Sequence, residues 1–542
     1  MRMKGARVYR RYLNRANGVA ALFIVLLACT VALAIEPIRL TEIRPDRELA
    51  EKTPPPYQPA RIEFTLQRPG MVTLAVYERG SDRLIREIFR AEKLEAGRHT
   101  TEWDGLDRNG RSVPPGAYQW RLLSSQGFAA RFVTTLGINP PSGLQGYFPR
   151  SWVGDHTGAG IVCVDQSGVY IGSPLTEGLM QTLKQSHDAK TRLWQQRQYY
   201  DGGQLTRMAA DAGRLFLIQA NGNLRRLDAN TGGQQAVWKI IWDKEPAADI
   251  DVCENNLVVC YRQHGAVRWI DPTSGRTVQT VEGIPGARAV TVREDGPSGE
   301  VLVVADAGIH SLSRQAPTPV KRIDGTGHLF EQIDVDHTTG EIYVLDHHQG
   351  QWVRRFDRQY KLVRSYGGPP RPFGRYDPKL LSGATDVAAD GRGGFYIAEP
   401  ATPPRRTAHF DAQTGRVIRE WYGGQSFYVD TAVDPRDPTN VWGCAGEGYI
   451  HHYKIDYDTG KWTVHATYAI GRLGDSLYPF SGKWHPMHRG GKLYLRHGNI
   501  AAVVRVDEEN RRVVPAAIAS YAHNGPVPGT PYITIGCHRR FC

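Results

Sequence analysis

The sequence predicts an all-β protein in which a small β-sandwich precedes a seven- or eight-bladed β-propeller. Two patterns predict it: short apolar runs that alternate with polar residues after residue 60, and an Asp-containing turn that returns roughly every 40 to 50 residues in the second half. The 542 residues include 58 Gly and 34 Pro, and 23% are charged. This composition excludes a disordered, collagen-like or coiled-coil chain.

The N-terminus predicts export. Six basic residues precede residue 35 without an acidic one among them, so they account for half of the net charge of +12. The uncharged apolar segment Gly18–Ile35 follows and contains the small-x-small pattern Ala32-Leu33-Ala34. This is the anatomy of a secretory signal peptide, residues 1–34, cleaved after Ala34.

Two alternatives to cleavage remain open. The apolar segment is long enough to span a bilayer, so residues 18–35 can also be an uncleaved membrane anchor. The run that ends at Cys29 resembles a bacterial lipobox. All three readings predict a periplasmic, cell-surface or secreted protein. Residues 35–59 are Pro-rich and charged and are predicted to be a linker.

Six cysteines follow the signal segment in a compartment where disulfides persist. A three-residue turn would place Cys253 opposite Leu257 and Cys260 opposite Ile250, with the two sulfurs on opposite faces of a sheet. Buried free thiols are therefore expected at these two positions. The remaining four are Cys163, Cys444, Cys537 and Cys542, of which the last two can pair.

Residues 60–137 form the first predicted domain. Its most specific stretch runs from Ala96 to Leu123, where an indole can fill the space between two sheets, carboxylates can accept turn amides, and three glycines permit positive φ. The stretch resembles the immunoglobulin-like domain of the FlgD flagellar hook-capping family. The resemblance implies a spacer or adhesive module without chemistry of its own. The matching residues include Trp103, Asp104, Gly105, Asp107, Gly110, Gly116 and Tyr118.

Residues 150–542 repeat, which predicts the propeller. Each unit ends on an Asp followed by Thr-Gly or Ser-Gly, and upstream lies a hairpin of two apolar strands. The clearest turns begin at Asp228, Asp271, Asp411 and Asp458. The units resemble NHL repeats, in which Asp346 and Glu399 occupy the acidic position that closes the second strand.

A second resemblance concerns packing. The segment from Asp411 to Trp421 is similar to the tryptophan-docking motif of pyrroloquinoline-quinone propellers, in which the indole bridges neighbouring blades. Most units lack the closing Trp, and the adjacent cysteines of many such dehydrogenases are absent. Nucleophile elbow, zinc-protease and nucleotide-binding motifs are also missing. The sequence therefore predicts no cofactor.

Candidate ligand-binding residues follow from blade geometry. Loops that enter first strands and leave second strands open onto one face of a propeller, so polar residues there would line a central bowl. The functional interpretation is a site for a polar ligand, whereas the structural one is that each acid caps a turn. Adjacent His residues on a strand point to opposite faces, so no metal site is predicted. The candidates are Asp306, Asp346, His347, Glu399, Glu447, Arg496 and His497.

The insertion Gly367–Ser382 provides a second candidate. Arg371, Arg375 and Tyr376 lie in it, among other basic and aromatic residues, and can form a clamp for an anionic polysaccharide. The alternative is a solvated blade edge that packs on its own aromatics.

These patterns predict an exported binding or interaction protein rather than an enzyme. The expected partner is a periplasmic or extracellular glycan or protein, and an extracellular polysaccharide is the ligand class considered first. Nucleic acid is not expected, and the membrane is contacted through the N-terminal segment alone. The alternative is a propeller enzyme of the polysaccharide lyase, lactonase or quinoprotein type that acts in the axial bowl.

Overall fold

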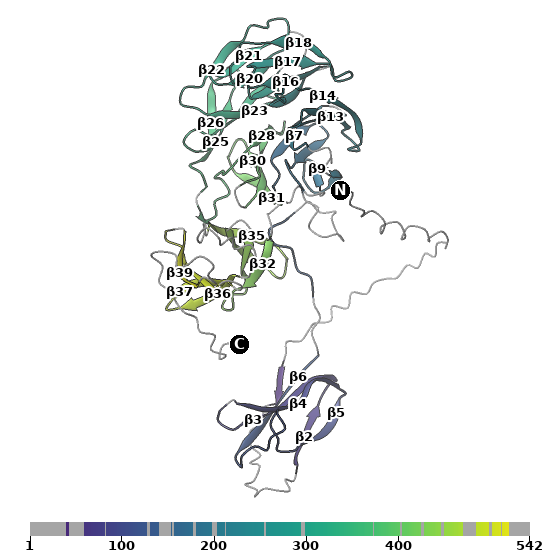
Figure 1. Ribbon diagram of the computed structural model, residues 1–542, viewed down its shortest axis with the longest axis vertical. Helices are drawn as coiled ribbons and strands as arrows, with labels where there is room; N and C mark the ends of the chain where they lie inside the picture. The colour runs from purple at the N-terminus through teal and green to yellow at the C-terminus, as the bar shows by residue number, and fades with distance from the viewer. Residues whose placement is uncertain are drawn as a thin grey trace, which may run out of the picture. The chain divides into compact units, whose positions relative to one another are not determined.

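A computed structural model describes the chain in parts (Figure 1). The described residues are 39–42, 59–81, 83–126, 131–139, 153, 157–176, 180–197, 203–211, 213–253, 256–293, 299–371, 373–401, 404–423, 428–445, 449–469, 484–497, 501–510 and 512–519. They form strands and turns without a helix, and so include no helix that could cross a membrane. The signal segment, Cys537 and Cys542 lie outside them. The chain divides into two compact units, Met1–Phe132 and Val133–Cys542.

The first unit contains two antiparallel sheets. One has the order β1-β6-β3-β4 and the other pairs β2 with β5 in unbroken register from Ala60 opposite Trp103 to Leu66 opposite Gly97. Apolar side chains from both sheets form one core. The strands are β1 (Arg39–Glu42), β2 (Ala60–Leu66), β3 (Gly70–Glu78), β4 (Leu84–Leu94), β5 (Gly97–Trp103) and β6 (Tyr118–Ser125).

The motif residues of this unit form its core and turns. The Trp103 indole is buried, donates to the carbonyl of Leu106 at 2.9 Å and meets the Tyr118 ring edge to face at 5.1 Å. Asp104 and Asp107 accept turn amides, and Gly105 and Gly110 each have a φ of +75°. Gly116 differs from the expectation because its φ is not positive.

Six four-stranded antiparallel sheets follow in the second unit. In each, the strands pair in chain order, so that the first strand is innermost. The sheets are β7 (Ile161–Asp165) to β10 (Arg192–Arg197), β11 (Leu205–Asp211) to β14 (Gln234–Lys239), β15 (Asp249–Cys253) to β18 (Thr277–Val281), β19 (Ala289–Val292) to β22 (Val320–Asp324), β23 (Phe330–Asp336) to β26 (Leu362–Gly368), and β28 (Asp386–Ala389) to β31 (Val417–Tyr422).

The innermost strands close a ring. Each packs against the next along the chain, and β28 of the sixth sheet packs against β7 of the first. The closing contact includes a hydrogen bond of 2.9 Å from the Val162 amide to the Asp386 carboxylate and one of 2.7 Å from the Thr385 hydroxyl to the Gly160 carbonyl. This closed ring of radial four-stranded sheets is a β-propeller. Six blades form it among the described residues, whereas the sequence predicted seven or eight.

Two further sheets explain the difference in number. They repeat the blade pattern but follow β31, after the ring has closed, and they pack against each other through β32, β33 and β36. A short strand in the predicted insertion, β27 (Gly374–Arg375), joins the first of them by pairing with β35. These sheets comprise β32 (Tyr428–Val433), β33 (Asn440–Ala445), β34 (Tyr449–Ile455) and β35 (Trp462–Ala469), and β36 (Trp484–Arg489), β37 (Lys492–His497), β38 (Ala501–Asp507) and β39 (Arg512–Ala519).

Turns and blade contacts follow the repeat, with two corrections. The turn before β35 is capped by Asp456, whose carboxylate accepts the amides of Asp458 and Thr459, so Asp458 is not the capping residue. The β15–β16 turn has two residues instead of three, which places Cys253 opposite Asn256 and Cys260 opposite Asp249. Cys260 is a buried free thiol, as is expected for one of the pair.

Candidate functional site

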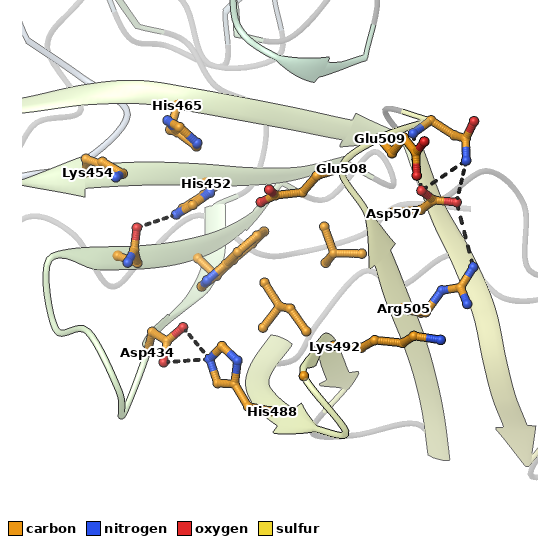
Figure 2. Close-up of a pocket in the computed structure, with 16 residues that line it drawn as sticks. Asp434, His452, Lys454, His465, His488, Lys492, Arg505, Asp507, Glu508 and Glu509 are labelled. Carbon is orange, nitrogen blue, oxygen red and sulfur yellow. Dashed lines mark hydrogen bonds and ion pairs between the residues drawn. The ribbon is translucent and has the colours of Figure 1, made fainter.

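A pocket lies between the two sheets that follow the ring (Figure 2). We call it the inter-sheet pocket. Its volume is about 760 Å³, and side chains from β33, β34 and β35 face others from the β36–β37 and β38–β39 turns across it. The two sheets contact each other through β32, β33 and β36 and also through β35 and β39, and the pocket lies between them.

Its floor is a pair of stacked rings. Trp442 and His452 are cross-strand partners whose ring centroids lie 4.1 Å apart. The Asn440 amide oxygen accepts from Nε2 of His452 at 2.8 Å, so the Nδ1 atom of this ring carries the lone pair. Neither that Nδ1 nor the Trp442 Nε1–H has a hydrogen-bond partner within the described residues. Burial, together with His465 and Lys454, lowers the pKa of His452 to about 3, so this imidazole is neutral.

A hydrogen-bonded pair of side chains, His488 and Asp434, closes one side of the pocket. The His488 Nε2 lies 2.9 and 3.1 Å from the two carboxylate oxygens of Asp434. Burial alone would raise the pKa of Asp434, but hydrogen bonds from the Arg436 amide and from His488 outweigh it and hold this pKa below its usual value. Asp434 is therefore ionised and already partnered.

The rim carries balanced charge. Three cations and three carboxylates line it, and Figure 2 shows Lys454 and Lys492 on opposite sides with Glu508 between them. Within the rim, the Arg505 guanidinium lies 3.7 Å from the Asp507 carboxylate. Lys454, Lys492, Glu508 and Glu509 are exposed, so their head groups can reach a ligand. The rim thus offers a ligand charged hydrogen-bond donors and acceptors in equal number.

The ring contains a second cavity of about 680 Å³ along its axis. The inner strands line it, and it reaches the turns that join first to second strands, at Gln166, His337 and Gly391. The predicted bowl belongs to the opposite end of the ring, because Asp306, Asp346 and Glu399 stand at the ends of second strands.

Asp346 lies within the fold rather than on a binding surface. Its carboxylate is fully buried and accepts from His328 Nδ1 at 2.8 Å, Arg354 Nε at 3.0 Å and two backbone amides. Burial would raise its pKa, yet the bonds from His328 and these amides hold the pKa below the ordinary value. This arrangement agrees with the turn-capping interpretation.

Three other predicted residues come together in a buried cluster. Glu399 is fully buried, forms an ion pair with Arg406 and lies 3.5 Å from Arg371. The Tyr376 hydroxyl donates to Glu420, and the Arg371 guanidinium lies 5.1 Å from the Tyr376 ring. Arg371 and Tyr376 therefore attach the insertion to the sixth blade through bonds that a surface clamp would have to break.

The remaining candidates are dispersed. Arg375 and Arg496 are exposed, His347 is half-buried, and Asp306 is largely exposed beside Arg288 at 2.7 Å. Glu447 and the side chain of His497 lie outside the described residues. Among the described residues, no set of three metal-ligating side chains converges.

Sequence reasoning missed the lining of both cavities. The signal for the axial cavity is the Asp-x-Asp alternation at Asp249 and Asp251, because period-2 residues on an inner strand share one face. The inter-sheet pocket has no comparable local signal, since its sides come from separate repeats.

No model of a known protein family matches the chain, and neither does any curated protein. Among solved structures, the Pan2 WD40 domain of Neurospora crassa is 12% identical, covering 55% of this chain and 86% of that one, with a TM-score of 0.32. BamB from Moraxella catarrhalis is 16% identical over 62% and 90%, with a TM-score of 0.28. The C-terminal WD40 domain of Sif2 is 12% identical over 64% and 95%, with a TM-score of 0.33. The closed ring of sheets itself defines the chain as a β-propeller protein.

Proposed function

We propose that the chain is an exported binding protein whose inter-sheet pocket takes a neutral, hydroxyl-rich ligand, namely an oligosaccharide. The balanced rim carries this proposal. A ligand of either charge would meet as many like charges as opposite ones, whereas each hydroxyl both donates and accepts and can satisfy Lys454 and Glu508 at once. The volume of about 760 Å³ lies in the range of small-molecule sites.

The N-terminal segment supports export. Its basic residues and the apolar run Gly18–Ile35 have the composition of a secretory signal or anchor, and either places the pocket where extracellular glycans occur. We propose the inter-sheet pocket in place of the polyanion clamp in the insertion, because Arg371 and Tyr376 are engaged within the fold.

Two rim substitutions of opposite charge test the proposal. We expect calorimetric titration of neutral tetrasaccharides, such as those of glucose, xylose and mannose, to find one that binds with a Kd below about 1 mM. Lys454→Met and Glu508→Gln should each weaken that binding about tenfold, since each removes a charged hydrogen-bonding group. Glu282→Gln, at an exposed position in the ring, is the matched control and should bind as the wild type does.

The two variants also separate ligand classes. An anionic ligand would bind more tightly to Glu508→Gln, and a cationic one more tightly to Lys454→Met. Either gain would contradict the proposal, as would a complete panel of neutral tetrasaccharides that fails to bind the wild-type protein.

A further inference from the structure

Seven aspartates line the axial cavity of the ring, and four of them, Asp249, Asp251, Asp334 and Asp386, bond to the next blade. Asp249 and Asp386 are 2% and 3% exposed, and Asp251 and Asp334 are half-buried at the cavity wall. Each carboxylate accepts the backbone amide of the next blade, which fixes its position. These bonds join Asp249 to Val290 at 2.9 Å, Asp251 to Val292 at 2.6 Å, Asp334 to Ala389 at 2.7 Å and Asp386 to Val162 at 2.9 Å.

Neither Asp251 nor Asp334 forms an ion pair among the described residues, although His337 lies near enough to Asp251 to oppose the rise in its pKa that burial causes. The Arg207 Nε lies 3.6 Å from Asp249, at one level of the cavity. At the next level, the Thr291 hydroxyl lies 3.1 Å from Asp251 and 3.4 Å from Asp334, and so links the two acids. In the part of the chain that the structure describes, neither acid has a basic side chain within ion-pair distance. A carboxylate can accept about four hydrogen bonds, so acceptor capacity remains at both.

Gln332 gives a second, independent indication of a ligand. Its side chain is 5% exposed and reaches from β23 to β15, where its Nε2 donates to Asp249 at 3.0 Å. Its Oε1 has no hydrogen-bond partner among the described residues, although Gln332 lines the cavity. A buried acceptor without a donor destabilises the fold, and a donor group placed in the cavity would recover this loss.

We infer that the axial cavity binds a primary alkylammonium group. Three N–H donors on one positive charge would match the acceptors of Asp251, Asp334 and Gln332. Ala209 and Ala388 also line the cavity and leave width for the alkyl chain. Asp251 and Asp334 stand on different blades, and among the described residues no three His, Cys, Asp or Glu side chains converge as a metal site requires. This inference is independent of the inter-sheet pocket.

The ammonium can come from a free amine or from a lysine side chain of a partner polypeptide. We would titrate the full chain with cadaverine, with a lysine tripeptide blocked at both ends, and with the same peptide acetylated on its side chain. We expect cadaverine and the lysine peptide to bind and the acetylated peptide to bind at least tenfold more weakly. Binding of the lysine peptide at least tenfold more tightly than cadaverine would identify a polypeptide as the source, and the reverse would identify a free amine.

Two separate substitutions test the inference, so that one still gives a result if the other unfolds the ring. Asp251→Asn and Asp334→Asn each replace a carboxyl group, which would ionise against a bound ammonium, by a neutral amide that retains the carbonyl oxygen used by the next blade. Each should weaken cadaverine binding at least tenfold. Asp306→Asn changes an exposed carboxylate at the opposite end of the ring and should change nothing. Unchanged binding by both cavity variants would overturn the inference, and so would saturable Ca²⁺ binding that excludes cadaverine.

Discussion

Aspartate has three different structural roles in this chain, and the position of each aspartate in its blade determines its role. At the last turn of a blade, as at Asp228, the carboxylate is half-buried and accepts two turn amides. At the end of a second strand, Asp346 is fully buried and joins a turn to a neighbouring loop. On an inner strand, Asp249 accepts an amide of the next blade. The first two roles have a local sequence signal, but the third depends on ring geometry.

The stability of the first unit depends strongly on the buried indole of Trp103. We expect Trp103→Ala to lower the free energy of unfolding of that unit by about 3–5 kcal/mol, because it removes a buried ring and leaves a cavity beside Tyr118. Scanning calorimetry should show the transition of the first unit shifted down while that of the ring is unchanged. Trp421→Ala, a buried indole of the ring, is the reciprocal control, and a joint shift of both transitions would contradict separate cores.

At the scale of the element, the blade turn shows what a glycine provides. Gly275 has a φ of +70°, and a Cβ atom there would lie 2.4 Å from the Trp238 ring of the preceding blade. Gly275→Ala should therefore cost about 1–2 kcal/mol in backbone strain and about 1–3 kcal/mol more in overpacking.

Gly283 separates these two costs. Its φ is +85°, but an added Cβ meets nothing within 4 Å, so Gly283→Ala should show the backbone cost alone. Melting temperatures of the two variants measure the difference. Equal losses would mean that the Trp238 ring moves away without cost and that the indole does not fix the distance between blades.

The strands themselves were predictable from the sequence because apolar and polar residues alternate along each of them. The alternation at Ile62, Phe64 and Leu66 falls on β2, and these side chains are buried. The same reasoning misplaced the cap at Asp458 because Asp456 precedes it by two residues, and both positions lead to the same Thr-Gly pair. Local patterns therefore identify an element but leave its register uncertain by one or two residues.

At the scale of the whole molecule, closure is the property that the sequence could not predict. Eight sheets follow residue 160, yet β28 packs on β7, and the last two sheets remain outside the ring. Which inner strand meets β7 is decided by contacts such as that of Asp386 with Val162, between residues more than two hundred positions apart. The inter-sheet pocket depends on this outcome, since both of its sheets lie outside the ring.

The axial carboxylates also make ring stability depend on pH. Burial raises the pKa of Asp249 and Asp386 to about 7, against the opposing effect of Arg207. Burial and the nearby Asp251 raise that of Asp334 to about 8. In the unfolded chain these groups ionise near pH 4, so the folded state holds more protons up to about pH 8. Stability is therefore lost as the pH rises through the folded-state values.

The window for measuring this effect is about pH 6.5 to 8. Below it, burial of His451 and His452 lowers their pKa to about 3, which produces the opposite slope. Within this window, each axial carboxyl group that still holds its proton should lower the free energy of unfolding by up to about 1.4 kcal/mol for each pH unit of increase. The melting temperature of the ring should therefore fall as the pH rises. Asp334→Asn should flatten the decline above pH 7, because Asp334 keeps its proton longest, whereas Asp306→Asn should leave it unchanged. A melting temperature that is constant or rises across this window would mean that the axial carboxylates are ionised in the folded ring.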